Sequence, residues 1–372
     1  MRDLFLLDPD VVFLNHGSYG ACPRLVFEEY QRIQLDVERA PIELLSLKRR
    51  HPELIAAARE RLAAYVGAAP EDLVFVPNAT TAVNMVARSL DLRPGDEIVS
   101  TTHEYGGNEP LWRYVCERRS ARYVEVDTMP ARAVDDLLGA VTPRTRVLFV
   151  SHISSPTALR FPVDELCARA RDAGVLTIVD GAHAPGQIAL DLDALGADFY
   201  TGNCHKWLCA PKGAAFLHVR ADAQQLLEPL AFSWDWTQGS WADRNRWAGT
   251  RDTSAYLAVP AAIDFHAAQH WDAVRERCHA LAVLAAEELR PLGLEPLPER
   301  DDEFVQMIAF RMPPCDAEQV TLRLAHEHRI EVLAQSWRGQ PTLRVSFQGY
   351  NDEQDLEALL HALSRLPRTR GK

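Results

Sequence analysis

The sequence predicts an α/β protein: a large domain with a mainly parallel sheet flanked by helices, followed by a smaller α+β domain. Five apolar, β-rich segments alternate with amphipathic segments between residues 73 and 180. Such alternation favours parallel strands joined by right-handed helical crossovers. Beyond residue 300 the pattern changes to strand, helix, two strands and helix, which indicates a second unit. A chain of 372 residues is long enough for two domains.

The expected elements follow from the spacing of apolar residues. Residues 11–20 combine an extended apolar run with a polar, glycine-rich turn, and 24–39 and 52–66 have helical spacing. Strands are expected at 73–76, 96–100, 122–126, 146–150 and 175–180, with helices after a turn at 77–82 and at 109–119, 132–140 and 163–173. Further strands at 198–201 and 211–219 precede a long helical stretch at 254–290. The last part predicts strands at 303–310, 330–334 and 341–347 and helices at 316–328 and 352–365.

Composition excludes several classes of protein. The net charge of −12 and pI of about 5.6 argue against a nucleic-acid partner, because no basic stripe would meet phosphates. We find no run of about 18 apolar residues, so no membrane span is expected. The first residues are too acidic for a signal peptide. The seven cysteines lack CxxC spacing, so we expect no disulfide framework, no metal site and a cytoplasmic protein.

An acid and an amine follow two neighbouring strands of the predicted sheet. Asp180 ends the strand at 175–180, and Lys206 comes shortly after the strand at 198–201. A lysine forms a Schiff base with an aldehyde, and a carboxylate keeps a pyridinium nitrogen protonated. The pair therefore predicts a pyridoxal phosphate (PLP) site, although Asp180 as a plain helix cap stays open. The chain has only four lysines among its 40 basic residues, which favours a chemical reason for Lys206.

Other segments have a functional and a structural interpretation, and both stay open on the residues alone. The Thr-rich turn at 77–82 suits a phosphate at a helix N-terminus, or is a simple helix cap. The loop at 101–108 contains rings that could stack on a pyridine ring, or is a polar loop. Arg344 suits a substrate carboxylate, or forms a structural salt bridge. Residues 232–247, with four tryptophans, suit a site wall or a subunit contact, or pack on their own domain.

Taken together, these pieces resemble a known family. FLNHGSYG, NATTAVN, THEYGGN, VDGAHAPGQ, CHKWLCAPKG, GTRD and LRVSFQGYN occur in the order typical of the class V aminotransferase group of fold type I PLP enzymes. NHGSYG and GTRD are most similar to its isopenicillin N epimerase-like branch. The resemblance implies a seven-stranded, mainly parallel sheet in a large PLP-binding domain at 16–260. It also implies a small domain made of 1–15 and 261–372, and a homodimer with sites shared between subunits.

The resemblance also implies roles for individual residues. Lys206 would form the Schiff base and Asp180 would pair with the pyridine nitrogen. Tyr105 falls where many relatives stack a histidine on the ring, with His103 as the competing candidate. These expectations name Lys206, Asp180 and Tyr105 as catalytic, with Tyr105 or a nearby histidine as a second acid or base.

Binding roles are implied for the remaining candidates. The phosphate would be held by the Ala79 N–H, Thr80, Asn203 and His205, and Thr250 would reach the phosphate of the partner subunit. Relatives often have serine where Asn203 stands. His183 falls near the ring hydroxyl, and His152 stands where many relatives have asparagine. Arg344 matches the arginine that holds the substrate α-carboxylate, and Asn15 and His16 are expected beside the substrate.

The family chemistry branches after the first step, and the sequence does not select the branch. We expect an epimerase acting on a small amino-acid substrate, with a β-eliminating C–S lyase and a class V aminotransferase as alternatives. Persulfide-forming desulfurase chemistry needs a cysteine in the C-terminal part, and residues 331–337 contain none. A non-catalytic protein of this fold would not need both Asp180 and Lys206, and no GxGxxG follows a strand as a nicotinamide enzyme requires.

Overall fold

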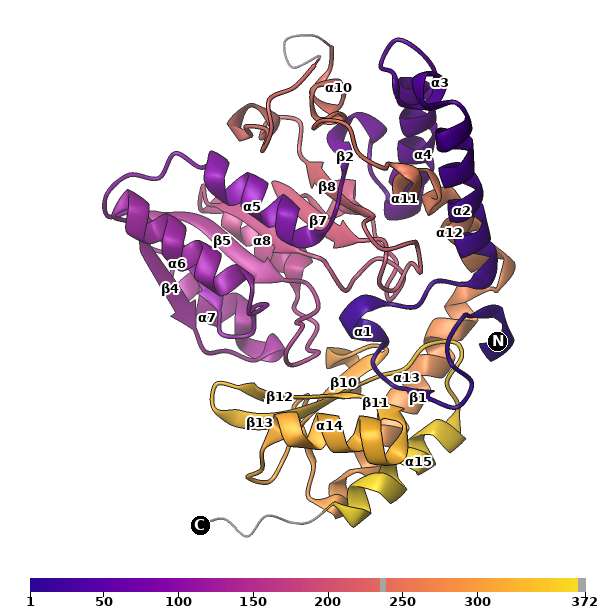
Figure 1. Cartoon of the computed structure of the whole chain (residues 1–372). Coiled ribbons are helices and arrows are strands. Elements are labelled where there is room, and N and C mark those ends of the chain that lie inside the picture. The colour runs from indigo at the N-terminus through magenta and orange to yellow at the C-terminus, as the bar shows by residue number, and fades with distance from the viewer. Residues whose placement is uncertain (235–238, 367–372) are drawn as a thin grey trace.

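The computed structural model describes residues 1–234 and 239–366, and within them a seven-stranded sheet forms the larger part of the molecule (Figure 1). Its strand order is β2-β8-β7-β6-β5-β3-β4. β8 is antiparallel to both neighbours and the other pairs are parallel, so the expected mainly parallel seven-stranded sheet is confirmed. The strands are β2 (Leu73–Val76), β3 (Glu97–Thr101), β4 (Arg122–Val126), β5 (Thr145–Ser151), β6 (Leu176–Asp180), β7 (Phe199–Asn203) and β8 (Ala215–Val219).

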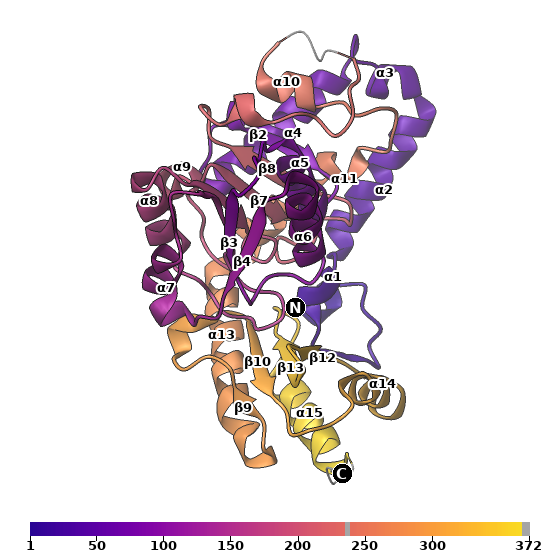
Figure 2. The ribbon, with the colours of Figure 1, turned by 90° about the vertical axis from the view of Figure 1, so that its left-hand side faces the viewer.

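Helices cover both faces of this sheet, as Figures 1 and 2 show. α5 (Ala79–Ser89) and α6 (Asn108–Arg119) lie on one face, and α7 (Ala133–Gly139) and α8 (Val163–Asp172) lie on the other. Side chains alternate accordingly along β5. Phe149 packs in the cluster under α5 and α6, whereas Leu148 and Val150 pack in the cluster on the α8 side. The inner strands β5 and β6 are buried on both faces, which explains why their sequences are nearly continuous apolar runs.

A smaller antiparallel sheet lies below the large one in Figure 1. It has the order β12-β13-β10-β9 and is accompanied by α13, α14 and α15. These elements are β9 (Glu295–Pro296), β10 (Met307–Arg311), β12 (Leu333–Trp337), β13 (Gln340–Ser346), α13 (Trp271–Glu288), α14 (Ala317–His328) and α15 (Glu353–Arg365). β1 (Val12–Phe13) pairs in parallel with β11 (Ile330–Glu331), beside this sheet. That pairing supports grouping 1–15 with the C-terminal part, and the domain boundaries stay a prediction.

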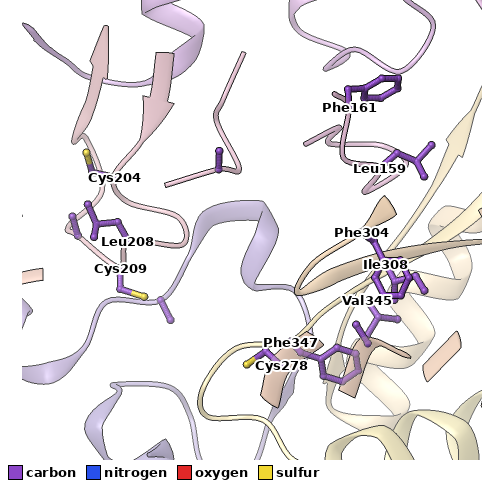
Figure 3. Close-up of a cluster of buried hydrophobic side chains, with 14 of the residues drawn as sticks. Leu159, Phe161, Cys204, Leu208, Cys209, Cys278, Phe304, Ile308, Val345 and Phe347 are labelled. Atoms are coloured by element: carbon purple, nitrogen blue, oxygen red, sulfur yellow. The ribbon is translucent and has the colours of Figure 1, made fainter. Parts of the chain in front are cut away.

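One apolar cluster is continuous between the two sheets (Figure 3). It includes Leu208 and Cys209 from the loop after β7, together with Ile308, Val345 and Phe347 from the small sheet. All five side chains are buried. The loop that carries Lys206 is therefore anchored in a core shared by both parts of the molecule.

Several expected elements differ in detail. The stretch at 254–290 is three helices, α11 (Ser254–Leu257), α12 (Val259–Ala268) and α13. The first break lies beside Pro260, which has no N–H for a continuous helix, and the second lies at His270, whose φ is 51°. The turn expected after residue 13 includes a short helix, α1 (His16–Tyr19). The strand expected at 330–334 divides into β11 and β12, which belong to different sheets.

The remaining helices pack around the large sheet or close its loops. They are α2 (Arg24–Arg39), α3 (Pro41–Leu45), α4 (His51–Val66), α9 (Leu192–Leu195) and α10 (Trp241–Asn245), with 3-10 turns at Arg2–Leu4, Pro70–Asp72, Pro130–Arg132, Gln224–Leu226, Arg290–Leu292 and Asp301–Glu303. Residues 235–238 of the tryptophan-rich segment lie outside the described residues. Within the described part, every helix is too short or too polar to cross a membrane.

Candidate active site

A cavity of about 420 Å³ opens at the carboxyl ends of the parallel strands, between the two sheets. This is the edge at which open α/β sheets place their ligands. Both parts of the chain contribute to its walls. The lining residues are Gly17, Ser18, Tyr19, Asn78, Ala79, Thr80, Tyr105, Ser151, Ile153, Ser155, Asp180, Ala182, His183, Asn203, His205, Lys206, Leu333, Gln335 and Arg344.

Asp180 is the last residue of β6 and lies in this cavity with only 4% of its surface exposed. Its Oδ1 accepts a hydrogen bond from the Ala182 N–H at 2.9 Å, and its Oδ2 accepts one from Asn108 Nδ2 at 2.7 Å. Burial raises the pKa of Asp180, while the Ala182 N–H, the charge of Lys206 and Asn108 oppose that rise. The carboxyl group is thus held in one orientation by its neighbours.

Lys206 follows β7 in a loop that is packed tightly against glycines. A Cβ at Gly20 would lie 2.1 Å from the His205 carbonyl oxygen, and a Cβ at Gly186 would lie 2.2 Å from that of Trp207. Because both glycines also have positive φ, the backbone around Lys206 requires glycine at these two positions. Burial, followed by the nearby Arg344 charge, lowers the pKa of Lys206 to about 7, and the Asp180 carboxylate acts in the opposite direction. Much of the amine is therefore unprotonated, and nucleophilic, near neutral pH.

The Lys206 amine contacts His183. Its Nζ lies 3.0 Å from His183 Nε2, and the indole Nε1 of Trp207 donates to His183 Nδ1 at 3.1 Å. Burial, followed by the charges of Lys206 and Arg344, holds the pKa of His183 well below its usual value. His183 is therefore a neutral imidazole beside the amine.

The N-terminus of α5 faces the same cavity. Asn78 caps the helix, with its side-chain oxygen accepting from the Thr81 N–H at 2.8 Å. The Ala79 N–H donates to Asn203 Oδ1 at 2.9 Å. His205 is fixed differently, since its Nδ1 lies 3.1 Å from the Ala214 carbonyl oxygen. The N–H groups of Ala79 and Thr81 thus bond within the chain, and the positive end of the helix dipole still attracts an anion, so this end of the cavity can accept a phosphate.

Arg344 lies opposite, on β13, and its side chain is buried. Its guanidinium donates to the Ser155 carbonyl oxygen at 2.7 Å and to Ser18 Oγ at 3.0 Å. Its Nε is buried without a hydrogen-bond partner in the part of the chain that the structure describes. Burial lowers the pKa of Arg344 to about 10, so the group stays charged at neutral pH. A fixed cation with an unused donor suits a carboxylate.

The chain matches the family model of class V aminotransferases over residues 23–359. It is 40% identical over 390 residues to isopenicillin N epimerase of Amycolatopsis lactamdurans, covering 98% of this chain and 97% of that one. The chain belongs to the class V aminotransferase family. Isopenicillin N epimerase of Streptomyces clavuligerus is 38% identical, with 98% and 97% covered. The solved structure of a cysteine desulfurase from Escherichia coli superposes with a TM-score of 0.85 and 25% identity, covering 98% and 96%.

Class V aminotransferases of these kinds are PLP-dependent enzymes, and this chain has the donor set that PLP requires. The cavity offers an amine for the aldehyde, a buried carboxyl group for the ring nitrogen and a helix N-terminus for the phosphate. The fold type I assignment made from the sequence is confirmed. Within the described residues, no group of three or more His, Cys, Asp or Glu is arranged to hold a metal ion.

Most candidate residues named from the family motifs line this one cavity. These are Ala79, Thr80, Tyr105, Asp180, His183, Asn203, His205, Lys206 and Arg344. The competing ring, His103, is buried behind the cavity, 4.8 Å from the Trp337 ring, whereas 44% of Tyr105 is exposed. The geometry therefore favours Tyr105 over His103 as the ring that meets a ligand.

Four candidates lie outside the cavity lining. His16 is buried beneath the site, where its ring contacts the Lys206 carbonyl oxygen at 3.0 Å and Tyr350 Oη at 2.9 Å. The Nδ1 of His152 lies 2.9 Å from Tyr200 Oη. Asn15 accepts from Ser18 Oγ at 2.7 Å, so it reaches the cavity only through Ser18. Thr250 is exposed elsewhere on the surface. Direct ligand contact from His16, His152 and Asn15 stays a prediction.

Three groups at the site were missed by the sequence interpretation. Asn108 holds Asp180, Ser155 holds Arg344, and Trp207 holds His183. Asn108 and Trp207 lie inside the motifs THEYGGN and CHKWLCAPKG, so the motifs already indicated that both residues are near the site. Ser155 lies in a loop without a recognised motif, and only its contact with Arg344 in the structure shows that it belongs to the site.

Proposed function

We propose that this chain is an epimerase that inverts the Cα centre of an amino-acid substrate, with isopenicillin N as the first substrate to test. Its identity to two isopenicillin N epimerases over 98% of its length supports this assignment. The geometric observation that carries the proposal is that Tyr105, a titratable phenol, lines the same cavity as Lys206. An epimerase needs two proton carriers, because the proton leaves one side of Cα and returns to the other.

The residues divide these tasks between them. PLP, when bound, withdraws electrons from an amino acid joined to it and makes the Cα–H acidic. Lys206, whose pKa is about 7, is suited to take or give that proton on its own side. His183 lies 3.0 Å from the lysine amine and so serves the same side. We assign the opposite side to Tyr105, and Arg344 holds the substrate carboxylate.

The finer binding roles are part of the same proposal. Ala79, Thr80, Asn203 and His205 hold the phosphate, supported by their position around the α5 N-terminus. We also propose a homodimer in which Thr250 reaches the partner's phosphate, supported by the exposure of Thr250 and by its position outside the lining of its own cavity. A cytoplasmic location is supported by seven unpaired cysteines. Light scattering of the purified protein tests the dimer.

A β-eliminating C–S lyase is the second candidate, because the fold matches a cysteine desulfurase closely. This second candidate does not include the transfer of sulfur to a cysteine of the enzyme, which would form a persulfide. Leu333 and Gln335 bring β12 to the cavity wall, and no cysteine is among the lining residues in the described part of the chain. A class V aminotransferase is the third candidate. The three differ in product. An epimerase gives an inverted amino acid. A C–S lyase gives pyruvate or another keto acid with ammonia and either sulfide or a thiol. An aminotransferase gives a keto acid and a new amino acid formed from a keto-acid acceptor.

The test incubates the holoenzyme in deuterated water with isopenicillin N and a panel of L-amino acids and cysteine conjugates. Chiral chromatography measures inversion, and coupled assays measure pyruvate and keto acid. We expect inversion with deuterium at Cα. Tyr105→Phe should lower inversion by about 10²- to 10⁴-fold, yet keep deuterium exchange into one enantiomer through Lys206.

Tyr114→Phe is the matched control, because Tyr114 is a similarly exposed tyrosine on α6 outside the cavity lining. It should leave inversion unchanged. Full inversion by Tyr105→Phe would remove Tyr105 from the mechanism. Pyruvate or keto acid without inversion in the wild type would overturn the epimerase proposal in favour of one of the alternatives.

A further inference from the structure

Trp207, the residue directly after Lys206, has no role in the functions considered so far. Its side chain is fully buried and lies beside the His16 ring, with ring centroids 4.9 Å apart. Its Nε1 donates to His183 Nδ1 at 3.1 Å, and the other ring nitrogen of His183 lies 3.0 Å from Lys206 Nζ. Indole, imidazole and amine therefore form one chain of hydrogen bonds.

The available hydrogen atoms determine which group donates and which group accepts in each of these hydrogen bonds. An indole N–H is only a donor, so His183 Nδ1 must accept and cannot carry a proton. A neutral imidazole then carries its proton on Nε2 and donates it toward Nζ. Only the unprotonated amine of Lys206 has a lone pair to accept that hydrogen bond.

Other charged groups face the same amine from neighbouring elements. Arg344 on β13 favours the unprotonated amine, and Asp180 on β6 favours the ammonium ion. His183 is neutral, as its strongly lowered pKa indicates, and burial also lowers the pKa of His205 to about 4. Burial is the largest influence on the pKa of Lys206, and it favours the unprotonated amine. The tautomer of His183 adds a further influence. As a donor, Nε2 stabilises the amine, whereas as an acceptor it stabilises the ammonium ion.

We propose that Trp207 is a positioning residue that fixes His183 in its Nε2–H tautomer and thereby favours the free-base form of Lys206. The contact concerns the lysine that takes the cofactor, so it holds whichever reaction the enzyme performs. The proposal about Trp207 therefore does not depend on the epimerase assignment.

The test measures the protonation of Lys206 in the full-length protein after the cofactor has been removed. Reductive methylation is followed against pH, and the Lys206 peptide is quantified by mass spectrometry. The wild-type midpoint should lie near the pKa of about 7. In Trp207→Phe the Nδ1–H tautomer becomes accessible, and its Nε2 accepts from the ammonium ion. The midpoint should rise by about one pH unit, which makes labelling about tenfold slower below it.

Two variants separate this effect from lost packing. Trp271→Phe removes a buried indole that donates to the Gly186 carbonyl oxygen at 2.9 Å, and it should leave the midpoint unchanged. In a His183→Leu background the side chain has neither a donor nor an acceptor, so adding Trp207→Phe should have no effect. An unchanged midpoint in Trp207→Phe alone would overturn the proposal. So would an equal rise with Trp271→Phe, or a rise that persists in the His183→Leu background.

A measurement on the wild type needs no variant. Nitrogen NMR of the ¹⁵N-histidine-labelled protein above pH 8 distinguishes the two tautomers, with the His183→Gln spectrum assigning the signal. We expect His183 to be protonated at Nε2 and unprotonated at Nδ1. A proton on Nδ1 would overturn the proposal even if Trp207→Phe failed to fold.

Discussion

The floor and the rim of the cavity are built differently. We define the floor as Asp180, His183, Lys206 and Arg344, and the rim as Tyr19 and Tyr105. Each floor side chain is held by a neighbour in its own chain. The rim tyrosines are 75% and 44% exposed. The proposed function assigns the chemistry shared by the family to the fixed floor, and it assigns the fate of the substrate to groups on the open rim.

The largest effect should come from the floor amine. Lys206→Ala should lower turnover by at least about 10⁴-fold and abolish the yellow colour of the lysine-bound cofactor, because the nucleophile and one proton carrier are lost together. Lys212→Ala is the matched control. Lys212 lies on the same loop but donates to the Gly20 carbonyl oxygen at 3.0 Å. Absorbance and product formation measure both. If the colour survives in Lys206→Ala, the floor does not hold the cofactor as described.

The floor was also the part most accessible to prediction from sequence. Asp180 and Lys206 follow strands, and the carboxyl ends of neighbouring parallel strands meet at one edge of a sheet. Alternation along β13 was equally informative. It separated Arg344, which faces the cavity, from Leu343 and Val345, which pack in the core.

Side chains outside the strands could not be placed in the same way. His16, in the short helix α1, and His152, directly after β5, belong to segments near the site, and their rings contact Tyr350 and Tyr200. His103 and Tyr105 stand two residues apart, and the burial of His103 beside Trp337 favours Tyr105 as the ring that meets a ligand. Direction in a loop depends on partners far along the chain, which no local pattern reveals.

The second prediction tests whether the floor also fixes the substrate. Arg344→Lys keeps the charge but loses the planar fork and its bonds to Ser18 and Ser155. We expect KM for the amino-acid substrate to rise about 10- to 100-fold with a smaller change in kcat, since a hydrogen bond to a charged group contributes about 1.5–3 kcal/mol. Arg311→Lys, an exposed arginine on adjacent β10, is the control. A loss confined to kcat would show that Arg344 does not bind the ground-state carboxylate.

Glu104 lies next to the rim, because it precedes Tyr105, and it is bonded to the end of β5. Its carboxyl group accepts from Thr101 Oγ1 and Ser151 Oγ, each at 2.6 Å. Burial raises its pKa from 4.5 to about 7 against these hydrogen bonds, and the charge of Asp180 adds to the rise. The folded state therefore binds this proton more tightly than the unfolded state. Its contribution to stability is greatest below pH 4.5 and is lost as the pH rises to about 7.

Glutamine cannot titrate, so Glu104→Gln should remove the loss of stability that Glu104 causes in the wild type as the pH rises. Relative to the wild type, its free energy of unfolding should improve by about 1–3 kcal/mol between pH 5 and pH 8. Urea unfolding at the two pH values measures the change. Glu97→Gln is a control in which the pKa shift has the opposite sign. The Thr142 hydroxyl and Arg144 hold the pKa of Glu97 below its usual value. That variant should be destabilised at both pH values. A pH-independent effect of Glu104→Gln would mean that Glu104 is ionised throughout.

The smallest effect should come from Asn15, which contacts the floor only through Ser18. Its side-chain oxygen accepts from Ser18 Oγ, and that hydroxyl accepts from Arg344. Asn15→Ala should raise KM about three- to tenfold, because one neutral hydrogen bond contributes about 0.5–1.5 kcal/mol. Ser18→Ala should cost a similar amount, and the double variant should cost less than the sum, since both act through one guanidinium. Additive losses, or a larger effect of Asn15→Ala than of Ser18→Ala, would instead indicate that Asn15 contacts the substrate directly.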